Sequence, residues 1–280
     1  MKYSLRTKST MKKNYEFDGE KYKNASAHQK EWGSEIIFEF KPESKSGLKL
    51  KGSERILDLG CGDGFLTQKL SGLVPHGKVL GIDASPGMIE TAKKLESKNL
   101  KFQFMDINDI NFIREFDVIF SNATLHWVKD HKKLLNNCYA ALRDNGFIRF
   151  NFAGCGNCAS FYKVIKEVMQ LDEYRNYFQN FEWPWYMPDI NEYKKLAADS
   201  NFKDIRVWEE NKDWYFPDEG SMVKWINQPS IVPFLAPVDK EYKEKFRSLV
   251  VSKMIAETKQ DNGTYFETFR RINLLAHKKT

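Results

Sequence analysis

Apolar positions between about residue 50 and residue 153 follow two alternating periods, and this alternation predicts strands interleaved with helices. Short apolar runs predict the strands, and amphipathic stretches predict the helices between them. Ser85 and Pro86 fit the N-cap and first position of one helix, and Asn145-Gly146 fits the end of another. The predicted strands are 55–59, 78–83, 100–105, 116–120 and 147–152, and the predicted helices are 65–73, 86–97 and about 130–142.

The pattern changes after residue 153. An amphipathic helical stretch is followed by an aromatic cluster broken by prolines, which predicts a cap over the edge of the sheet. We assign a helix to 160–179, a helix to 189–199, a strand to 202–210, mostly helix to 217–262 and one long strand to 265–277.

Strands that alternate with helices at this spacing favour an α/β fold of parallel βαβ units, with helices on both faces of the sheet. A final antiparallel pair of strands with a helical insertion between them explains the order of the last elements. The predicted divisions are N-terminal lid helices (1–50), the core (51–153), a cap insertion (154–188) and the end of the sheet (189–280) with a helical insertion at 217–262.

Composition narrows the function classes. The chain has 280 residues, 41% of them hydrophobic, which is enough to build a sizeable core. Lys and Arg number 44 against 38 Asp and Glu, and part of this small excess lies in the two ends, so we expect no nucleic-acid partner. No apolar stretch is long enough to span a bilayer, and four cysteines do not make a disulfide framework. We expect a cytoplasmic protein, a monomer or weak dimer, with no membrane partner.

The chemistry is concentrated in the stretch 58–64, Asp-Leu-Gly-Cys-Gly-Asp-Gly, between a predicted strand and a predicted helix. Glycines at alternate positions allow a tight turn and a close approach of the backbone to a ligand. Asp83 ends the next strand, at about the 20-residue distance where such folds place a ribose-binding carboxylate. The spacing is neither that of dinucleotide sites nor that of a P-loop. Asp58 fits loop support and ligand contact equally well.

This stretch resembles motif I of the class I S-adenosylmethionine-dependent methyltransferases, and the match continues through 83–88, 106–107 and 121–127. The resemblance implies a Rossmann-like, seven-stranded, mostly parallel sheet with an antiparallel last strand and helical cap insertions, and S-adenosylmethionine as cofactor. It implies that the methionine half of the cofactor contacts Gly60, Cys61 and Gly62, the ribose contacts Asp83, the adenine contacts Ala84, Met88, Asp106 and Ile107, and the amino-acid end contacts the backbone carbonyl of Asn122.

More narrowly, the layout is similar to the trans-aconitate and juvenile-hormone-acid type of small-molecule methyltransferases, on the stretches 22–32, 122–127 and 183–186. The trans-aconitate enzymes have an Arg where this chain has Gln29, so we carry over the reaction class and not the substrate. We expect methyl transfer to a small molecule, with O-methylation of a carboxylic acid favoured. N- or C-methylation, and cofactor binding without catalysis, remain as alternatives.

The acceptor side offers fewer signals. His126 is the one natural base near the site, and it fits proton transfer, substrate contact or loop packing. Trp127, Trp185 and Tyr186 fit the wall of an acceptor pocket or ordinary core. Tyr22 and Gln29, together with Trp32, fit a lid over the cofactor. Cys155 and Cys158 have the spacing of half a zinc site, but a second ligand pair is missing, so we expect no metal.

Overall fold

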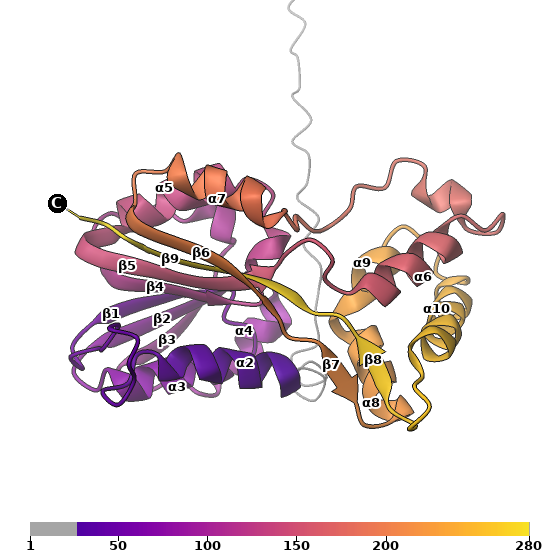
Figure 1. Ribbon diagram of the computed structural model, residues 1–280, viewed down its shortest axis with the longest axis horizontal. Helices are drawn as coiled ribbons and strands as arrows, with labels where there is room; N and C mark the ends of the chain where they lie inside the picture. The colour runs from indigo at the N-terminus through magenta and orange to yellow at the C-terminus, as the bar shows by residue number, and fades with distance from the viewer. Residues whose placement is uncertain (1–26, 280) are drawn as a thin grey trace, which may run out of the picture.

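The computed structural model describes residues 27–279, and its centre is a seven-stranded sheet in the order β3-β2-β1-β4-β5-β9-β6 (Figure 1). Neighbouring strands from β3 to β5 are parallel, and β9 runs antiparallel to both β5 and β6. The strands are β1 (Arg55–Leu59), β2 (Lys78–Asp83), β3 (Leu100–Phe104), β4 (Phe116–Asn122), β5 (Leu142–Ala153), β6 (Lys203–Asn211) and β9 (Arg270–His277). The predicted mostly parallel sheet with an antiparallel last strand is confirmed.

Helices cover both faces of this sheet because its central strands are apolar on both sides. One core packs strand residues such as Leu57 and Ile119 against Leu134 and Tyr193. The other core lies on the opposite face of the sheet and packs Ile56 against helix residues such as Leu70 and Ile89. The first face carries α5 (His131–Ala141) and α7 (Ile190–Ala198), and the second carries α2 (Ala27–Phe38), α3 (Phe65–Leu73) and α4 (Pro86–Lys93).

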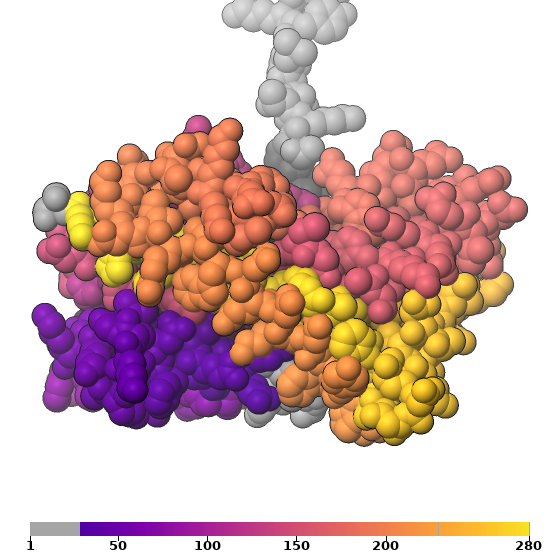
Figure 2. Space-filling view, in the orientation of Figure 1, coloured from indigo at the N-terminus to yellow at the C-terminus, as the bar shows by residue number. Residues whose placement is uncertain are grey.

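The cap forms a third core at one end of the molecule, beside the sheet (Figures 1 and 2). The two predicted insertions, far apart in sequence, pack together in it: Phe161 and Val164 share this core with Phe246 and Val250. An ion pair between Lys163 and Glu257, 2.8 Å, also joins them. The cap helices are α6 (Ala159–Met169), η3 (Arg175–Phe178), α8 (Glu219–Trp225), η4 (Ile226–Ser230), α9 (Val232–Leu235) and α10 (Lys243–Thr258).

The long strand predicted over 265–277 is wrong, because the chain divides it between two sheets. Its first part, β8 (Tyr265–Glu267), pairs with β7 (Trp214–Phe216) inside the cap, and only β9 belongs to the main sheet. At the break, the hydroxyl of Thr268 donates to the carbonyl of Gly156 (3.0 Å), and the Phe269 N–H donates to the Asp213 carboxylate (3.1 Å). The carbonyls of Thr268 and Phe269 accept the backbone N–H groups of Cys158 and Lys212, both at 2.8 Å, so the backbone groups at the break are paired outside the ladder.

Two predicted helices are also shorter than expected. The helix predicted over 86–97 ends at Lys93, and the one over 160–179 ends at Met169 before the separate turn η3. After the first, the Asn99 side chain donates to the carbonyls of Ser71 and Val74 and fixes a turn. None of the described helices is long and apolar enough to cross a membrane.

Candidate functional site

A cavity of about 910 Å³ lies between the sheet, the cap and α2. Part of its wall comes from the carboxyl ends of β1, β2 and β4, where ligands bind in open α/β sheets. We call this part the glycine-loop half; it includes Gly60, Gly62 and Asp83. The other part, the cap half, includes His126, Trp185 and further residues from the cap and from β9. The volume is typical of a small-molecule site.

The glycine loop depends on backbone conformations that side chains oppose. Gly60, Gly62 and Gly64 all have positive φ, +73°, +54° and +82°. The N–H groups of Gly60 and Cys61 both donate to the carbonyl of Ile82 (2.8 and 2.9 Å), which fixes the turn against β2. A Cβ at residue 60 would lie 2.0 Å from Cγ2 of Thr124. The turn is therefore closed to any side chain at this position.

Asp83, at the end of β2, lies beside this turn with its carboxylate oriented by backbone donors. Its Oδ2 accepts the N–H of Gly62 (3.0 Å), and its Oδ1 accepts the N–H of Ser85 (2.9 Å). Ser85 in turn caps α4 through its hydroxyl, as the sequence predicted. An ionised carboxylate only accepts hydrogen bonds, so Asp83 presents acceptor oxygens beside the turn.

Asp58 and Cys61 lie deeper in the same wall. Asp58 is 2% exposed, and its Oδ2 accepts the hydroxyl of Thr67 at 2.7 Å. Burial, which outweighs this hydrogen bond, raises the pKa of Asp58 to about 7, and the charge of Asp83 adds to the effect. Burial first, then the charges of Asp83 and Asp58, raise the pKa of the Cys61 thiol well above its usual range. The Asp58 carboxyl thus both holds α3 and faces the cavity.

The residues predicted to meet the adenine all line the cavity. Ala84 and Met88 lie at the start of α4, and Asp106 and Ile107 lie at η1 (Ile107–Asp109). Asp106 also serves locally, because its Oδ1 accepts from the backbone and side-chain nitrogens of Asn108, both at 2.8 Å.

Asn122 and Gln29 bring β4 and α2 together at the cavity. The Asn122 amide donates to the backbone carbonyl of Gln29 at 3.2 Å. The side-chain oxygens of both residues are buried and have no hydrogen-bond partner among the described residues. Next to Gln29, Lys30 forms an ion pair with Asp63 of the glycine loop at 2.7 Å. Tyr22, the other predicted lid residue, lies outside the described residues.

His126 lies on η2 (Leu125–Trp127), and its ring is neutral at neutral pH. Burial, then the positive charge of Arg271, then His131, lower the pKa of His126 well below its usual range. Its Nδ1 is buried without a hydrogen-bond partner among the described residues. His131 has a different role: its ring contacts the hydroxyl of Tyr193 (3.0 Å) and the carbonyl of Leu125 (2.9 Å), so it holds the η2 turn in place.

Trp127 and Trp185 line the cavity, with ring centroids 5.6 Å apart. Tyr186 is not among the lining residues. Its ring packs on His131 (4.9 Å), its N–H donates to the carbonyl of His126 (2.7 Å), and its hydroxyl donates to Glu192 (2.8 Å). It ties the cap to α7 rather than facing the cavity.

Sequence reasoning missed much of the cap half. The missed lining residues of this half include Asn157, Cys158, Phe161, Trp225, Phe269 and Arg271. One signal was available: the first residues of an antiparallel last strand lie at the edge where the parallel strands end. Applied to the strand as it begins in the structure, at Arg270, the rule places Arg271 at the ligand edge; the predicted start at residue 265 concealed this. No sequence pattern links Phe161 and Trp225 to that edge, because they come from separate insertions.

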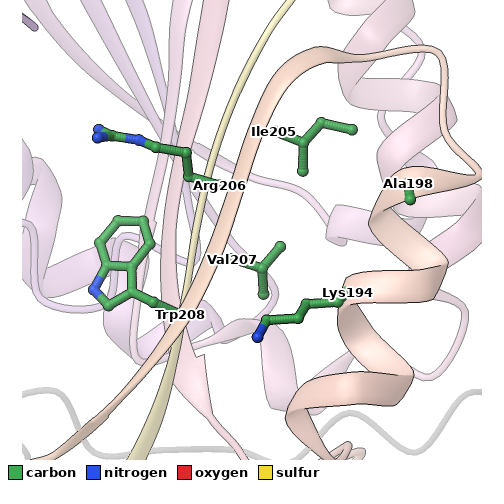
Figure 3. Close-up of a pocket in the computed structure, with 6 residues that line it drawn as sticks. All are labelled: Lys194, Ala198, Ile205, Arg206, Val207 and Trp208. Carbon is green, nitrogen blue, oxygen red and sulfur yellow. The ribbon is translucent and has the colours of Figure 1, made fainter.

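A second hollow, of about 540 Å³, lies between α7 and the edge strand β6 (Figure 3). Ile205 and Val207 point toward α7, whereas Arg206 and Trp208 point to the opposite side of the strand (Figure 3). Its described lining has no carboxylate, histidine, thiol or hydroxyl side chain: Lys194 and Arg206 are the charged residues, and the others are apolar or aromatic. Among the described residues there is also no group of three or more His, Cys, Asp or Glu side chains that could hold a metal ion.

Comparison with known proteins agrees with this geometry. A family model described as "Methyltransferase domain" matches residues 50–211. The chain is 35% identical over 156 residues to malonyl-[acyl-carrier protein] O-methyltransferase 1 of Ilyobacter polytropus, an alignment that covers 54% of this chain and 57% of that relative. It is 26% identical to trans-aconitate 2-methyltransferase of Mycolicibacterium gilvum, covering 84% of this chain and 91% of the relative. The YcgJ protein of Bacillus subtilis, at 15% identity, shares the fold with a TM-score of 0.56 over 89% of this chain and 98% of that one.

Proposed function

We propose that this chain, which belongs to the methyltransferase-domain family, methylates the carboxylate of a small organic acid. As a member of that family it is an S-adenosylmethionine-dependent methyltransferase. The acceptor, and the roles of individual residues, are our proposal.

The glycine-loop half fits the cofactor. The loop leaves room for a ligand beside Gly62, where nothing lies within 4 Å of a Cβ position, and the fixed carboxylate of Asp83 can accept the two ribose hydroxyls. The orphaned buried oxygen of Asn122 can accept from an ammonium group. The remaining contacts are proposed for Asp58, Cys61, Gly62, Ala84, Met88, Asp106, Ile107 and Gln29, all of which line the cavity.

When bound, the cofactor supplies an electrophilic methyl group, so that the acceptor's oxygen–methyl bond forms as the sulfur–methyl bond breaks and its electron pair stays on sulfur. The protein's own work is to orient the acceptor and exclude water. Trp127 and Trp185 are the proposed walls for this task, since both line the cavity.

The neutral state of His126 is the observation that favours a carboxylate as the methyl acceptor. Its depressed pKa makes it a weak base, poorly matched to an amine or phenol that must lose a proton. A carboxylate is already ionised at neutral pH and needs no base. The similar proteins named above act on malonyl-[acyl-carrier protein] and on trans-aconitate, which also favours an acid.

A panel of acids, amines and phenols tests this proposal, with release of S-adenosylhomocysteine as the readout. We expect turnover of one or more acids. Turnover confined to amines or phenols would contradict the carboxylate, and tight cofactor binding without turnover of any class would indicate a non-catalytic binding protein.

The N-terminal segment is a proposed lid, because Gln29 and Trp32 line the cavity and Lys30 pairs with Asp63 of the glycine loop. We expect the cofactor to protect the first 40 or so residues from proteolysis; an unchanged cleavage pattern would contradict this. A cytoplasmic location, a monomer or weak dimer and the absence of a nucleic-acid partner stay predictions.

A further inference from the structure

Arg271 is a buried cation at the ligand edge of the sheet. It is the second residue of β9 and lies opposite Ala153, the last residue of β5. Because β9 is antiparallel, its first residues lie where the parallel strands end. The side chain is 3% exposed and lines the cavity.

The guanidinium of Arg271 is held in a fixed orientation. Its Nε and Nη2 donate to Oδ1 of Asn151 at 2.9 and 2.7 Å, and its central carbon lies 5.6 Å from the ring centroid of Trp32. Asn151 is itself fixed, since its amide donates to Asn273 at 2.9 Å. A preorganised guanidinium loses little further freedom on binding an anion.

Arg271 places one positive charge in the cap half. It helps to keep the neighbouring His126 neutral. Burial and then the charge of Glu267 raise the pKa of the Cys158 thiol well above its usual range, and Arg271 opposes this rise. The three lysines of the described lining are more exposed: Lys30 is 17% exposed, and Lys129 and Lys133 are exposed at the rim. Among the described lining residues, Arg271 is therefore the one buried cation.

The cap half of the cavity also has aromatic walls and an orphaned donor. Phe161, Trp225 and Phe269 line the cavity with it, and Nε1 of Trp185 is buried with no hydrogen-bond partner among the described residues. An indole N–H can only donate, so a ligand that satisfies it must be an acceptor. A carboxylate has lone pairs for both a guanidinium and an indole.

We propose that Arg271 anchors the acceptor's carboxylate and that the acceptor is a monocarboxylic acid with an apolar body. An apolar cavity alone would raise the acid's pKa and oppose entry of the charged form, and the buried guanidinium reverses both effects. Further carboxylates would be buried without a counter-charge, which is costly. Methyl transfer converts the anion to a neutral ester, which no longer pairs with Arg271 and leaves more readily. This inference rests on the proposed function and specifies its substrate class.

The test compares the variants R271Q and R271K with the control variant R270Q. Arg270 is the neighbouring residue, and it forms an exposed ion pair with Asp213 outside the cavity. The acceptors are octanoate, phenylacetate, citrate, trans-aconitate, octylamine and phenol, and calorimetric affinity for S-adenosylmethionine checks the cofactor site. We expect the wild type to favour the monocarboxylates. We expect R271Q to raise their KM about thirtyfold, as loss of a hydrogen bond to a charged group does, with cofactor affinity unchanged, R271K intermediate and R270Q like the wild type.

An unchanged KM in R271Q would overturn the inference. A wild type that prefers citrate or trans-aconitate would also overturn it, while leaving the proposed carboxyl methylation standing. Turnover of octylamine or phenol alone would contradict both the role of Arg271 and the proposed carboxyl methylation. If R271Q does not fold, binding of octanoate and of its neutral amide to the wild type, with S-adenosylhomocysteine present, decides the matter: we expect octanoate to bind at least about tenfold more tightly, and equal affinities would overturn the inference.

Discussion

The glycine-loop half of the cavity is shaped mainly by backbone, whereas the cap half is shaped by side chains from distant parts of the chain. In the first, Gly60, Cys61 and Gly62 follow one another and are fixed by the carbonyl of Ile82 and the carboxylate of Asp83. In the second, aromatic residues from two insertions meet an arginine from the last strand. The first half offers an environment suited to one fixed cofactor, and the second can change its acceptor by substitution of a few side chains.

Replacement of Gly60 by alanine should give the largest effect, and we expect it on cofactor binding. The new Cβ meets Thr124, and φ of +73° is unfavourable for alanine. Strain and overpacking together are worth about 3 kcal/mol, so we expect affinity for S-adenosylmethionine to fall about a hundredfold by calorimetry. Gly72→Ala is the control, because Gly72 lies in α3 without a positive φ and nothing lies within 4 Å of its Cβ position. Comparable losses in the two variants would show that the close packing at residue 60 is irrelevant.

Asp83→Asn tests whether a side chain of the glycine-loop half affects the cofactor and not the acceptor. Loss of a charged acceptor should weaken cofactor binding about tenfold, while the KM of the acceptor at saturating cofactor stays within about twofold. Asp144→Asn, at an exposed ion pair with Arg114 outside the cavity, serves as control. If cofactor affinity survives in D83N, the ribose assignment is lost.

Trp185→Phe probes the cap half with a smaller change. The ring is retained and the orphaned Nε1 donor is removed, so we expect the acceptor KM to rise about fivefold, the worth of about one neutral hydrogen bond, with cofactor affinity unchanged. The control is Trp208→Phe, which removes the indole that lies on β6 beside Arg149. It should leave both the acceptor KM and the cofactor affinity unchanged. Weaker cofactor binding in W185F would mean that the two halves are not separable.

Asp58→Asn should alter stability with pH. The raised pKa of about 7 means that the folded protein keeps a proton which the unfolded chain loses near its ordinary pKa of 3.8. Stability from this group therefore falls as pH rises from about 4 to about 7 and is constant above that range. Asparagine does not titrate, so the Tm of the variant relative to the wild type should rise between pH 5 and pH 8 by on the order of 5 °C. A difference in Tm that does not change with pH would contradict the raised pKa.

The same contrast explains what could be predicted from sequence. The glycine loop, Asp83 and Asn122 could be placed because each follows a strand in a βαβ unit, where local pattern determines position. Tyr186 was predicted at the acceptor pocket and lies outside it, while Arg271 was missed, because both positions depend on how the insertions fold back on the sheet. The break in the strand at Thr268 has the same cause. The apolar pattern predicts one continuous strand, but its first residues pair with β7 in the cap instead of joining the main sheet.

A crystal structure of the protein with S-adenosylhomocysteine tests the central claim most directly. We expect density for the compound along residues 60–62, with both ribose hydroxyls within hydrogen-bond distance of the Asp83 carboxylate and the sulfur facing the cap half. Density for the compound elsewhere, or a glycine loop filled by the protein's own side chains, would contradict the account.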